Sequence, residues 1–241
     1  MTDGPAIRAR LGVVPQEDTL DVELTVRENL LIYGRYFGLP RPVIADRTAR
    51  LLDFVQLTER ADDQVDPLSG GMKRRLTIAR SLINDPDILI LDEPTTGLDP
   101  QARHVVWDRL FRLKQQGVTL ILTTHYMDEA EQLCDRLVVM DAGKIAAEGS
   151  PRELIDTYST REVLELRFAV TDHEHAAEIV AGAKADRIEA LADRILLYVA
   201  DGDAALARVR GLGLEPVTSL VRRSTLEDVF LRLTGRQLED G

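Results

Sequence analysis

Residues 88–95, Ile-Leu-Ile-Leu-Asp-Glu-Pro-Thr, place an unbroken apolar run directly before two adjacent carboxylates. A continuous apolar run of this length is typical of a buried parallel strand. Open α/β sheets bind their ligands at the carboxyl ends of such strands. The stretch therefore predicts a parallel sheet with Asp92 and Glu93 at its carboxyl edge. An acidic strand end that merely turns the chain would have the same local sequence.

Two further segments are expected as strands of the same sheet. Residues 11–14 lead through Pro15 to Gln16, and the apolar run 118–122 leads through two threonines to His125. A glutamine at a strand end is usually a turn residue, and a lone histidine usually makes a structural hydrogen bond. Taken singly, neither residue indicates a site.

Helices are expected between these strands, since capping residues and prolines precede amphipathic patterns. Their starting points are Thr25 of the capping box Thr25–Glu28, Pro42, Ser69, Asp99 and Ser150. A hairpin about Ala142–Gly143 is expected between residues 136–140 and 144–148. This alternation predicts an α/β domain over residues 1–157, with a helical subdomain at 20–66.

The order of elements changes after residue 157. Strands are expected at 163–170, 187–191, 194–199 and 216–221, and helices at 174–183, 204–212 and 226–233. This βαββαβ order, followed by one helix, predicts a small ferredoxin-like α+β appendage over residues 158–241.

Composition limits the classes of function. The 241 residues carry 30 Lys and Arg against 41 Asp and Glu, and the parts before and after residue 150 are both acidic, by −6 and −5. Electrostatic binding to nucleic acid or to an anionic membrane is therefore not expected. Cys134 is the single cysteine, which fits a reducing compartment. The longest uncharged segment near the apolar runs, 115–127, is too short to span a bilayer. We therefore expect a cytoplasmic chain without direct membrane insertion.

A glycine pair precedes the helix expected after Ser69. In Ser69-Gly70-Gly71 the glycines allow a ligand close to the backbone, and the free N–H groups of a helix start attract phosphate. By itself this is more simply a capped helix after a turn.

The combination of these segments is more specific than any of them alone. Over residues 7–157 their order resembles the ATP-binding-cassette (ABC) transporter ATPase family, which has a P-loop-NTPase-like fold. The residues that carry the resemblance are Gln16, Ser69, Gly70, Gly71, Asp92, Glu93, Asp99 and His125.

The resemblance implies a role for each of these residues. Glu93 and His125 would be catalytic, and Asp92 and Gln16 would hold Mg²⁺. ATP would be bound by Gln16, Ser69, Gly70, Gly71 and Asp99, with two copies of the subunit closing head to tail around two nucleotides. One subunit would then offer Ser69–Gly71 to the nucleotide of the other.

The sequences of four shorter segments narrow the resemblance to ABC-2 type exporters of the drug-resistance and nodulation-factor branch. It rests on residues 25–30, 71–75 and 124–131, and on the tail at 225–231. This implies a separate membrane permease as partner, a location at the inner face of the membrane, and contact with the permease through residues 20–66. Two alternatives remain: a soluble ABC protein unconnected with transport, and an interaction module built on the appendage.

One family motif is missing from the 241 residues. Phosphoryl transfer in this class uses Gly-x-x-x-x-Gly-Lys-Ser/Thr, in which backbone amides and the lysine hold the phosphates. The one Gly-Lys pair, Gly143-Lys144, is followed by Ile145 and has Val138 in place of the first glycine. The favoured interpretation is a fragment or a misassigned start. A split gene and a non-hydrolysing regulatory subunit are the others.

The missing loop yields a direct test. We expect the 241-residue chain to bind ATP only weakly, because the loop that cradles the phosphates is not in it. Titration of the purified chain with a non-hydrolysable ATP analogue measures this affinity. A dissociation constant in the micromolar range would contradict the expectation.

Overall fold

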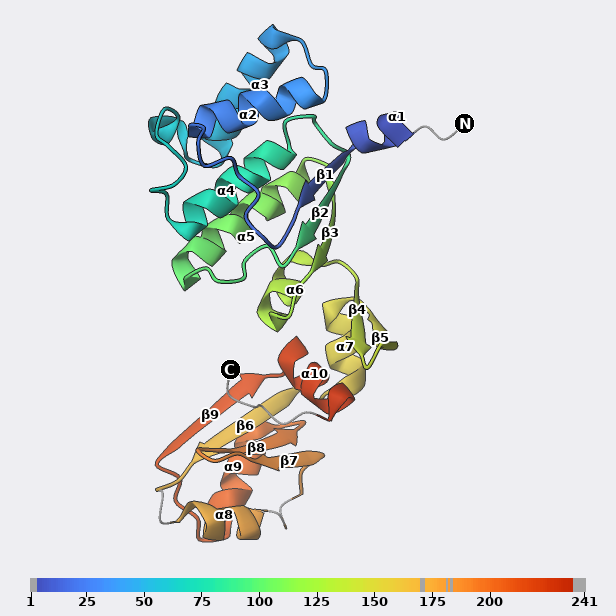
Figure 1. The fold of residues 1–241 in the computed structure, drawn as a ribbon. Helices are drawn as coiled ribbons and strands as arrows, with labels where there is room; N and C mark the ends of the chain where they lie inside the picture. Colours follow the sequence, from blue (N-terminus) through green and yellow to red (C-terminus); the bar gives the residue numbers. More distant parts are fainter. Residues whose placement is uncertain (1–3, 170–171, 181, 183, 236–241) are drawn as a thin grey trace. The chain divides into compact units, whose positions relative to one another are not determined.

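The structure is a computed structural model that describes residues 4–169, 172–180, 182 and 184–235 (Figure 1). The chain divides into two compact units, Met1–His125 and Tyr126–Gly241, and each is described by itself. The sequence instead suggests a domain boundary after residue 157, and that boundary remains a prediction.

A three-stranded parallel sheet forms the centre of the first unit. Its strands are β1 (Leu11–Val14), β2 (Ile88–Asp92) and β3 (Thr119–Thr123), in the order β1-β2-β3. Leu11 pairs with Ile88, which in turn pairs with Thr119, and every later residue keeps this register. The α/β class predicted from the apolar runs is confirmed.

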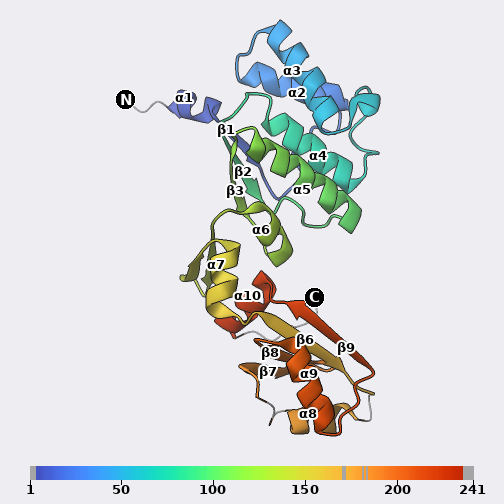
Figure 2. The ribbon, with the colours of Figure 1, turned by 180° about the vertical axis from the view of Figure 1, so that it is seen from behind.

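Helices α4 (Gly70–Ser81) and α5 (Pro100–Gln115) lie side by side against one face of this sheet, as Figures 1 and 2 both show. Apolar runs predict strands that are buried on both faces. That expectation is wrong for one row of side chains. Val13, Ile90 and Ile121 are paired across the strands, and they are 55%, 37% and 53% exposed. Both helices cover the opposite face, so this row stays open.

A helical layer lies on the other side of α4. It contains α2 (Val26–Tyr36), α3 (Arg41–Phe54) and η1 (Thr58–Arg60), and a short α1 (Gly4–Ala9) precedes β1. The predicted capping box is present: the Glu28 N–H donates to Thr25 Oγ1 at 3.2 Å, and the Thr25 N–H donates to Glu28 Oε2 at 2.9 Å. Buried leucines from α2, α3, the N-cap of η1 and α4 then form one apolar cluster: Leu30, Leu52, Leu57 and Leu76.

The second unit begins with α6 (Met127–Leu133), the hairpin strands β4 (Leu137–Asp141) and β5 (Lys144–Gly149), and α7 (Pro151–Tyr158). The predicted hairpin is confirmed. Its turn residues Ala142 and Gly143 have φ of +46° and +74°, as a tight two-residue turn requires. The single Gly-Lys pair of the sequence is therefore a hairpin turn.

The rest of this unit is the α+β appendage. Strands β6 (Glu162–Arg167), β7 (Arg187–Ala190), β8 (Ile195–Val199) and β9 (Thr218–Arg223) form an antiparallel sheet in the order β7-β8-β6-β9. Helices α8 (His173–Val180) and α9 (Gly202–Gly211) pack on one face of it. Helix α10 (Leu226–Thr234) follows β9. The predicted βαββαβ order is confirmed. The predicted strand end at Val170 and helix end at Ala183 lie outside the described residues.

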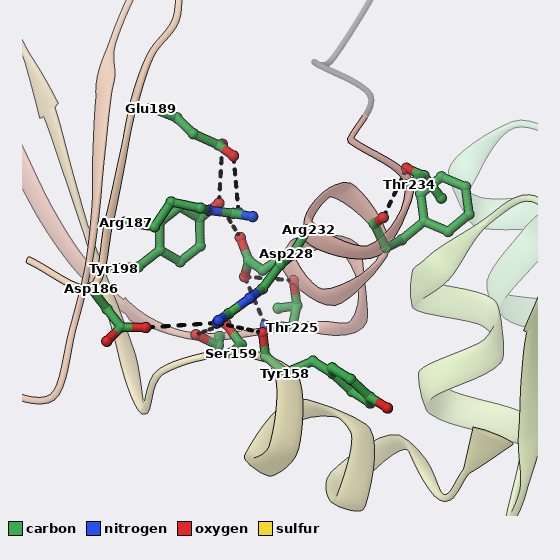
Figure 3. Close-up of polar contacts among 12 residues, drawn as sticks. Tyr158, Ser159, Asp186, Arg187, Glu189, Tyr198, Thr225, Asp228, Arg232 and Thr234 are labelled. Carbon is green, nitrogen blue, oxygen red and sulfur yellow. Dashed lines mark hydrogen bonds and ion pairs between the residues drawn. The ribbon is translucent and has the colours of Figure 1, made fainter. Parts of the chain in front are cut away.

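A buried polar network fastens α10 to this sheet. Asp228 accepts two hydrogen bonds from Arg222, at 2.7 and 2.9 Å. It also accepts one from the Thr225 N–H at 2.8 Å and one from the Tyr198 hydroxyl at 3.1 Å (Figure 3). Burial favours the neutral acid, but these donors outweigh it and lower the pKa of Asp228 below its ordinary value. Burial beside Asp228 and Glu189 raises the pKa of Tyr198.

We expect Asp228→Asn to destabilise β9 and α10 by about 3 kcal/mol, because it leaves Arg222 without its buried counterion. The matched control is Asp186→Asn: Asp186 pairs with Arg232 at 3.7 Å, and both side chains are about half exposed. The control is expected to cost about 0–1 kcal/mol. Native-state hydrogen exchange over residues 218–234 measures both opening free energies.

The same pair has a defined pH dependence. Because the pKa of Asp228 is lowered on folding, its contribution is fully present above about pH 4 and is lost as the pH falls through the folded-state pKa. The difference between wild type and Asp228→Asn should therefore shrink in acid. Equal effects of Asp228→Asn and Asp186→Asn at neutral pH would contradict this account of the network.

Candidate functional site

Three chain segments leave the parallel sheet at one edge. Val14 pairs with Leu91, and Asp92 pairs with Thr123, so β1, β2 and β3 end together. Gln16, Glu93 and His125 follow within two residues of these ends. The topology therefore brings these three residues to the carboxyl edge of the sheet, where α/β sheets usually bind ligands.

The Glu93 carboxylate is the centre of this cluster. Its Oε2 accepts a hydrogen bond from Gln16 Nε2 at 3.1 Å and one from the Thr96 hydroxyl at 2.8 Å, and it lies 3.3 Å from His125 Nδ1. The Glu93 side chain is 26% exposed, and that of His125 is 54% exposed. The carboxylate is thus held in position but still reached by water, as a group that accepts a proton from water must be.

The backbone at Glu93 is strained. Its φ is +43°, a left-handed conformation that side chains other than glycine rarely adopt and that costs of the order of 1–3 kcal/mol. The Glu93 N–H donates to the carbonyl oxygen of Thr123 at 3.1 Å and lies 3.3 Å from the Thr123 hydroxyl. These contacts with the end of β3 hold the strained residue against its neighbouring strand.

Asp92 ends β2 beside Glu93 and accepts a hydrogen bond from the Thr123 hydroxyl. Its carboxylate and the amide oxygen of Gln16 are hard oxygen donors of the kind that Mg²⁺ prefers. No group of three or more His, Cys, Asp or Glu that could hold a metal occurs among the described residues. Asp92 and Gln16 would supply only part of a Mg²⁺ shell, and waters and phosphates would supply the rest.

The other predicted residues form a second cluster, at the amino ends of α4 and α5. Ser69 Oγ accepts from the Met72 N–H at 3.3 Å, and Asp99 Oδ1 accepts from the Ala102 N–H at 2.9 Å, so both are N-caps. A Cβ added at Gly71 would lie 2.8 Å from that of Ala102, whereas one added at Gly70 meets nothing within 4 Å. Gly71 thus permits the two helix starts to touch, and Gly70 faces open space.

Three residues of the first cluster had no role in the sequence analysis. Thr96 and Thr123 place hydroxyls on Glu93 and Asp92. Arg74 of α4 donates to the carbonyl oxygens of Pro94 at 2.7 Å and of Asp92 at 2.8 Å. A hydroxyl three residues after an acid was a usable signal for Thr96. Arg74 stands in the basic run Lys73-Arg74-Arg75, which is indistinguishable in sequence from a solvated helix face.

Comparisons with known proteins point to two families. A family described as "ABC transporter" matches residues 2–96, and the C-terminal domain of nodulation factor export protein NodI matches residues 171–235. The chain is 51% identical over 236 residues to the Nod factor export ATP-binding protein I of Cupriavidus metallidurans, covering 98% of this chain and 76% of that protein. It is 52% identical over 233 residues to that of Rhizobium meliloti, covering 97% and 68%.

The fold is also similar to solved structures of ABC transporter proteins. The cbiO1 protein of Clostridium perfringens, described as part of the ABC transporter complex cbiONQ, aligns with a TM-score of 0.58 and 31% identity. The alignment covers 62% of this chain and 61% of that one. The ATP binding subunit of another ABC transporter aligns with a TM-score of 0.56 and 29% identity, covering 65% of each chain. Within the part of the chain that the structure describes, no helix is long and apolar enough to cross a membrane.

The two glycines at the start of α4 give a matched test of the second cluster. We expect Gly71→Ala to destabilise the first unit by about 1–3 kcal/mol, because the new methyl group pushes α4 away from α5. Gly70→Ala should change stability by no more than about 0.5 kcal/mol. Trp107, the single tryptophan, lies on α5 and reports urea unfolding by its fluorescence. Equal stabilities of the two variants would mean that the helix starts do not touch.

Proposed function

The chain belongs to the ABC transporter ATPases, in the branch of Nod factor export ATP-binding protein I, and from this we propose that it is the ATP-hydrolysing subunit of an ABC-2 type exporter. The observation that carries the proposal is the convergence of Gln16, Glu93 and His125 at one sheet edge. Since the loop Gly-x-x-x-x-Gly-Lys-Ser/Thr is not among the 241 residues, hydrolysis is proposed for a subunit whose nucleotide site includes that loop.

In this proposal Glu93 acts on the attacking water. Its carboxylate orients the water and takes up its proton as the water oxygen bonds to the γ-phosphorus. The bond from that phosphorus to the bridging oxygen of the β-phosphate breaks, which leaves ADP and phosphate. Gln16 and Thr96 hold the carboxylate through hydrogen bonds, and His125 contacts an oxygen of the terminal phosphate.

The charge of the phosphates requires a cation. Asp92 and Gln16 would hold Mg²⁺ there, and the ion would neutralise phosphate charge. The second cluster serves the nucleotide of a partner subunit: the N–H groups at the start of α4 favour an anion, and the open space at Gly70 admits one. This geometry supports a homodimer that holds ATP between Glu93 of one copy and Ser69–Gly71 of the other.

Transport requires a membrane partner. The relatives are named for Nod factor export, and we propose that this chain likewise drives export through a separate permease at the inner face of the membrane. The helical layer within residues 20–66 is the proposed contact with that permease. A soluble ABC protein without a transport role is not favoured, because the relatives of nearly the full chain are named as export proteins.

Replacement of the central carboxylate tests the proposal. In a form of the subunit that carries the phosphate loop, Glu93→Gln keeps the hydrogen-bonding shape but removes the base. We expect ATP affinity within about 3-fold of wild type and a fall in kcat of about 10²–10⁴-fold. Equilibrium binding and phosphate release measure the two quantities.

The control is Glu178→Gln, at an exposed acid of α8 outside both clusters and outside residues 20–66, which should hydrolyse ATP at the wild-type rate. Wild-type turnover by Glu93→Gln would remove Glu93 from the catalytic role.

A further inference from the structure

One cation of α4 joins the loops that carry Gln16 and Glu93. The guanidinium of Arg74 donates from Nη1 to the carbonyl oxygen of Pro15 at 2.5 Å and, at 3.5 Å, to that of Gln16. It donates from Nε to Pro94 at 2.7 Å, and from Nη2 to the carbonyls of Asp92 at 2.8 Å and Glu93 at 3.0 Å. A single side chain thus ties the loop after β1 to the loop after β2.

The acceptors of these five contacts are all main-chain oxygens. Arg74 therefore fixes the path of the two loops without occupying the carboxylates of Asp92 and Glu93 through these bonds. An arginine suits this task, because its planar fork carries five N–H donors in fixed directions and stays charged at any physiological pH. A lysine, with three donors on one nitrogen, cannot reach the same set of carbonyls.

The anchoring matters most at Glu93. That residue has the strained φ of +43°, and Arg74 binds its carbonyl oxygen as well as those of the residues before and after it. A strained conformation persists only where surrounding contacts over-determine it. Arg74 supplies such contacts on one side of Glu93, and Thr123 supplies them on the other.

Arg74 also lies one turn after the second cluster. Helix α4 begins at Gly70, and its N-cap Ser69 belongs to the residues proposed to meet a partner's nucleotide. Further along the helix, Arg80 donates to the carbonyl oxygen of Thr19 at 2.6 Å. Residues 15–19 are therefore held to α4 at both ends, so a displacement of α4 carries Gln16 with it.

We propose that Arg74 is a positioning residue that couples the start of α4 to the first cluster, Gln16, Glu93 and His125, by fixing the backbones of Gln16 and Glu93. A nucleotide held at Ser69–Gly71 would, through Arg74, bias the placement of the carboxylate that serves the other nucleotide. The effect on hydrolysis rests on the proposed function, whereas the fixing of the two loops does not.

The chain offers a matched pair of variants. Arg75, the next residue, donates from Nη1 to the carbonyl oxygen of Val55 at 2.7 Å, so it ties α4 to the end of α3 instead. Arg74→Lys and Arg75→Lys are therefore the same substitution on the same helix, aimed at different segments. Both keep the positive charge.

The first measurement is hydrogen exchange on the 241-residue chain, followed by mass spectrometry. Informative amides in the two loops are Glu93, which donates to Thr123 of β3, Thr96, which donates to Glu93, and Leu20, which donates to the Asp18 carboxylate. The reference amide is Leu57, which donates to Leu52 of α3. Arg74→Lys should speed exchange at the first three at least 10-fold and leave Leu57 within about 2-fold of wild type. Arg75→Lys should do the reverse.

Two results would overturn the proposal. One is wild-type exchange at Glu93 and Thr96 in Arg74→Lys. The other is loss of the Trp107 unfolding transition in that variant, since Arg74 would then be a residue on which the whole unit depends.

The second measurement separates this proposal from the proposed function. In the subunit that carries the phosphate loop, Arg74→Lys should lower kcat at least 10-fold and change KM for ATP less than 3-fold, while Arg75→Lys changes kcat less than 3-fold. If Glu93→Gln still hydrolyses ATP, the proposed function fails. If Glu93→Gln is inactive but Arg74→Lys keeps the wild-type kcat, the coupling through Arg74 fails.

Discussion

The in-register parallel pairing of β1, β2 and β3 is the constraint on which the candidate site depends. Because the three strands end at the same level, Gln16, Glu93 and His125 emerge at one edge although they lie far apart in the sequence. A shift of one residue in either pairing would turn each side chain to the opposite face. The hydrogen bonds around Glu93 thus follow from backbone pairing set by apolar residues such as Val14, Leu89 and Leu91.

Helix α4 connects this edge of the sheet to the rest of the first unit through packing and hydrogen bonds. Its apolar side chains pack against the helical layer through Leu76 and Ala79, and its arginines reach the loops at the sheet edge and the end of α3. Its amino end carries the glycines next to α5. Packing, charge and a candidate phosphate contact therefore lie on one rigid element. In an ATPase that closes around its nucleotide, such a helix can transmit a displacement from the nucleotide contact at Ser69–Gly71 to the cluster around Glu93.

The amino-acid sequence predicts the elements well, because each has a local cause. Apolar runs predict the strands, the capping box at Thr25 predicts the start of α2, and the turn at Ala142–Gly143 predicts the hairpin. The residues quoted for the site also lie in two clusters at helix starts and strand ends. The correct predictions of helices, strands and the hairpin depend on patterns within about ten residues.

What could not be predicted involves partners distant in the sequence. Nothing local to Lys73-Arg74-Arg75 shows that Arg74 reaches carbonyls near residues 15 and 93, or that Arg75 reaches Val55. The hydrogen bond from Tyr198 to Asp228 was likewise not predictable, because Tyr198 lies on β8, far from Asp228 in the sequence. The exposed row of Val13, Ile90 and Ile121 was also missed, because an apolar run does not tell which faces of a strand are covered.

The most direct measurement of the central claim is a crystal structure of the subunit, in a form that carries the phosphate loop, with Mg²⁺ and a non-hydrolysable ATP analogue. The account predicts that the terminal phosphate lies at the edge formed by Gln16, Glu93 and His125, opposite Ser69–Gly71 of the partner subunit. A nucleotide whose phosphates contact neither of these clusters would contradict it.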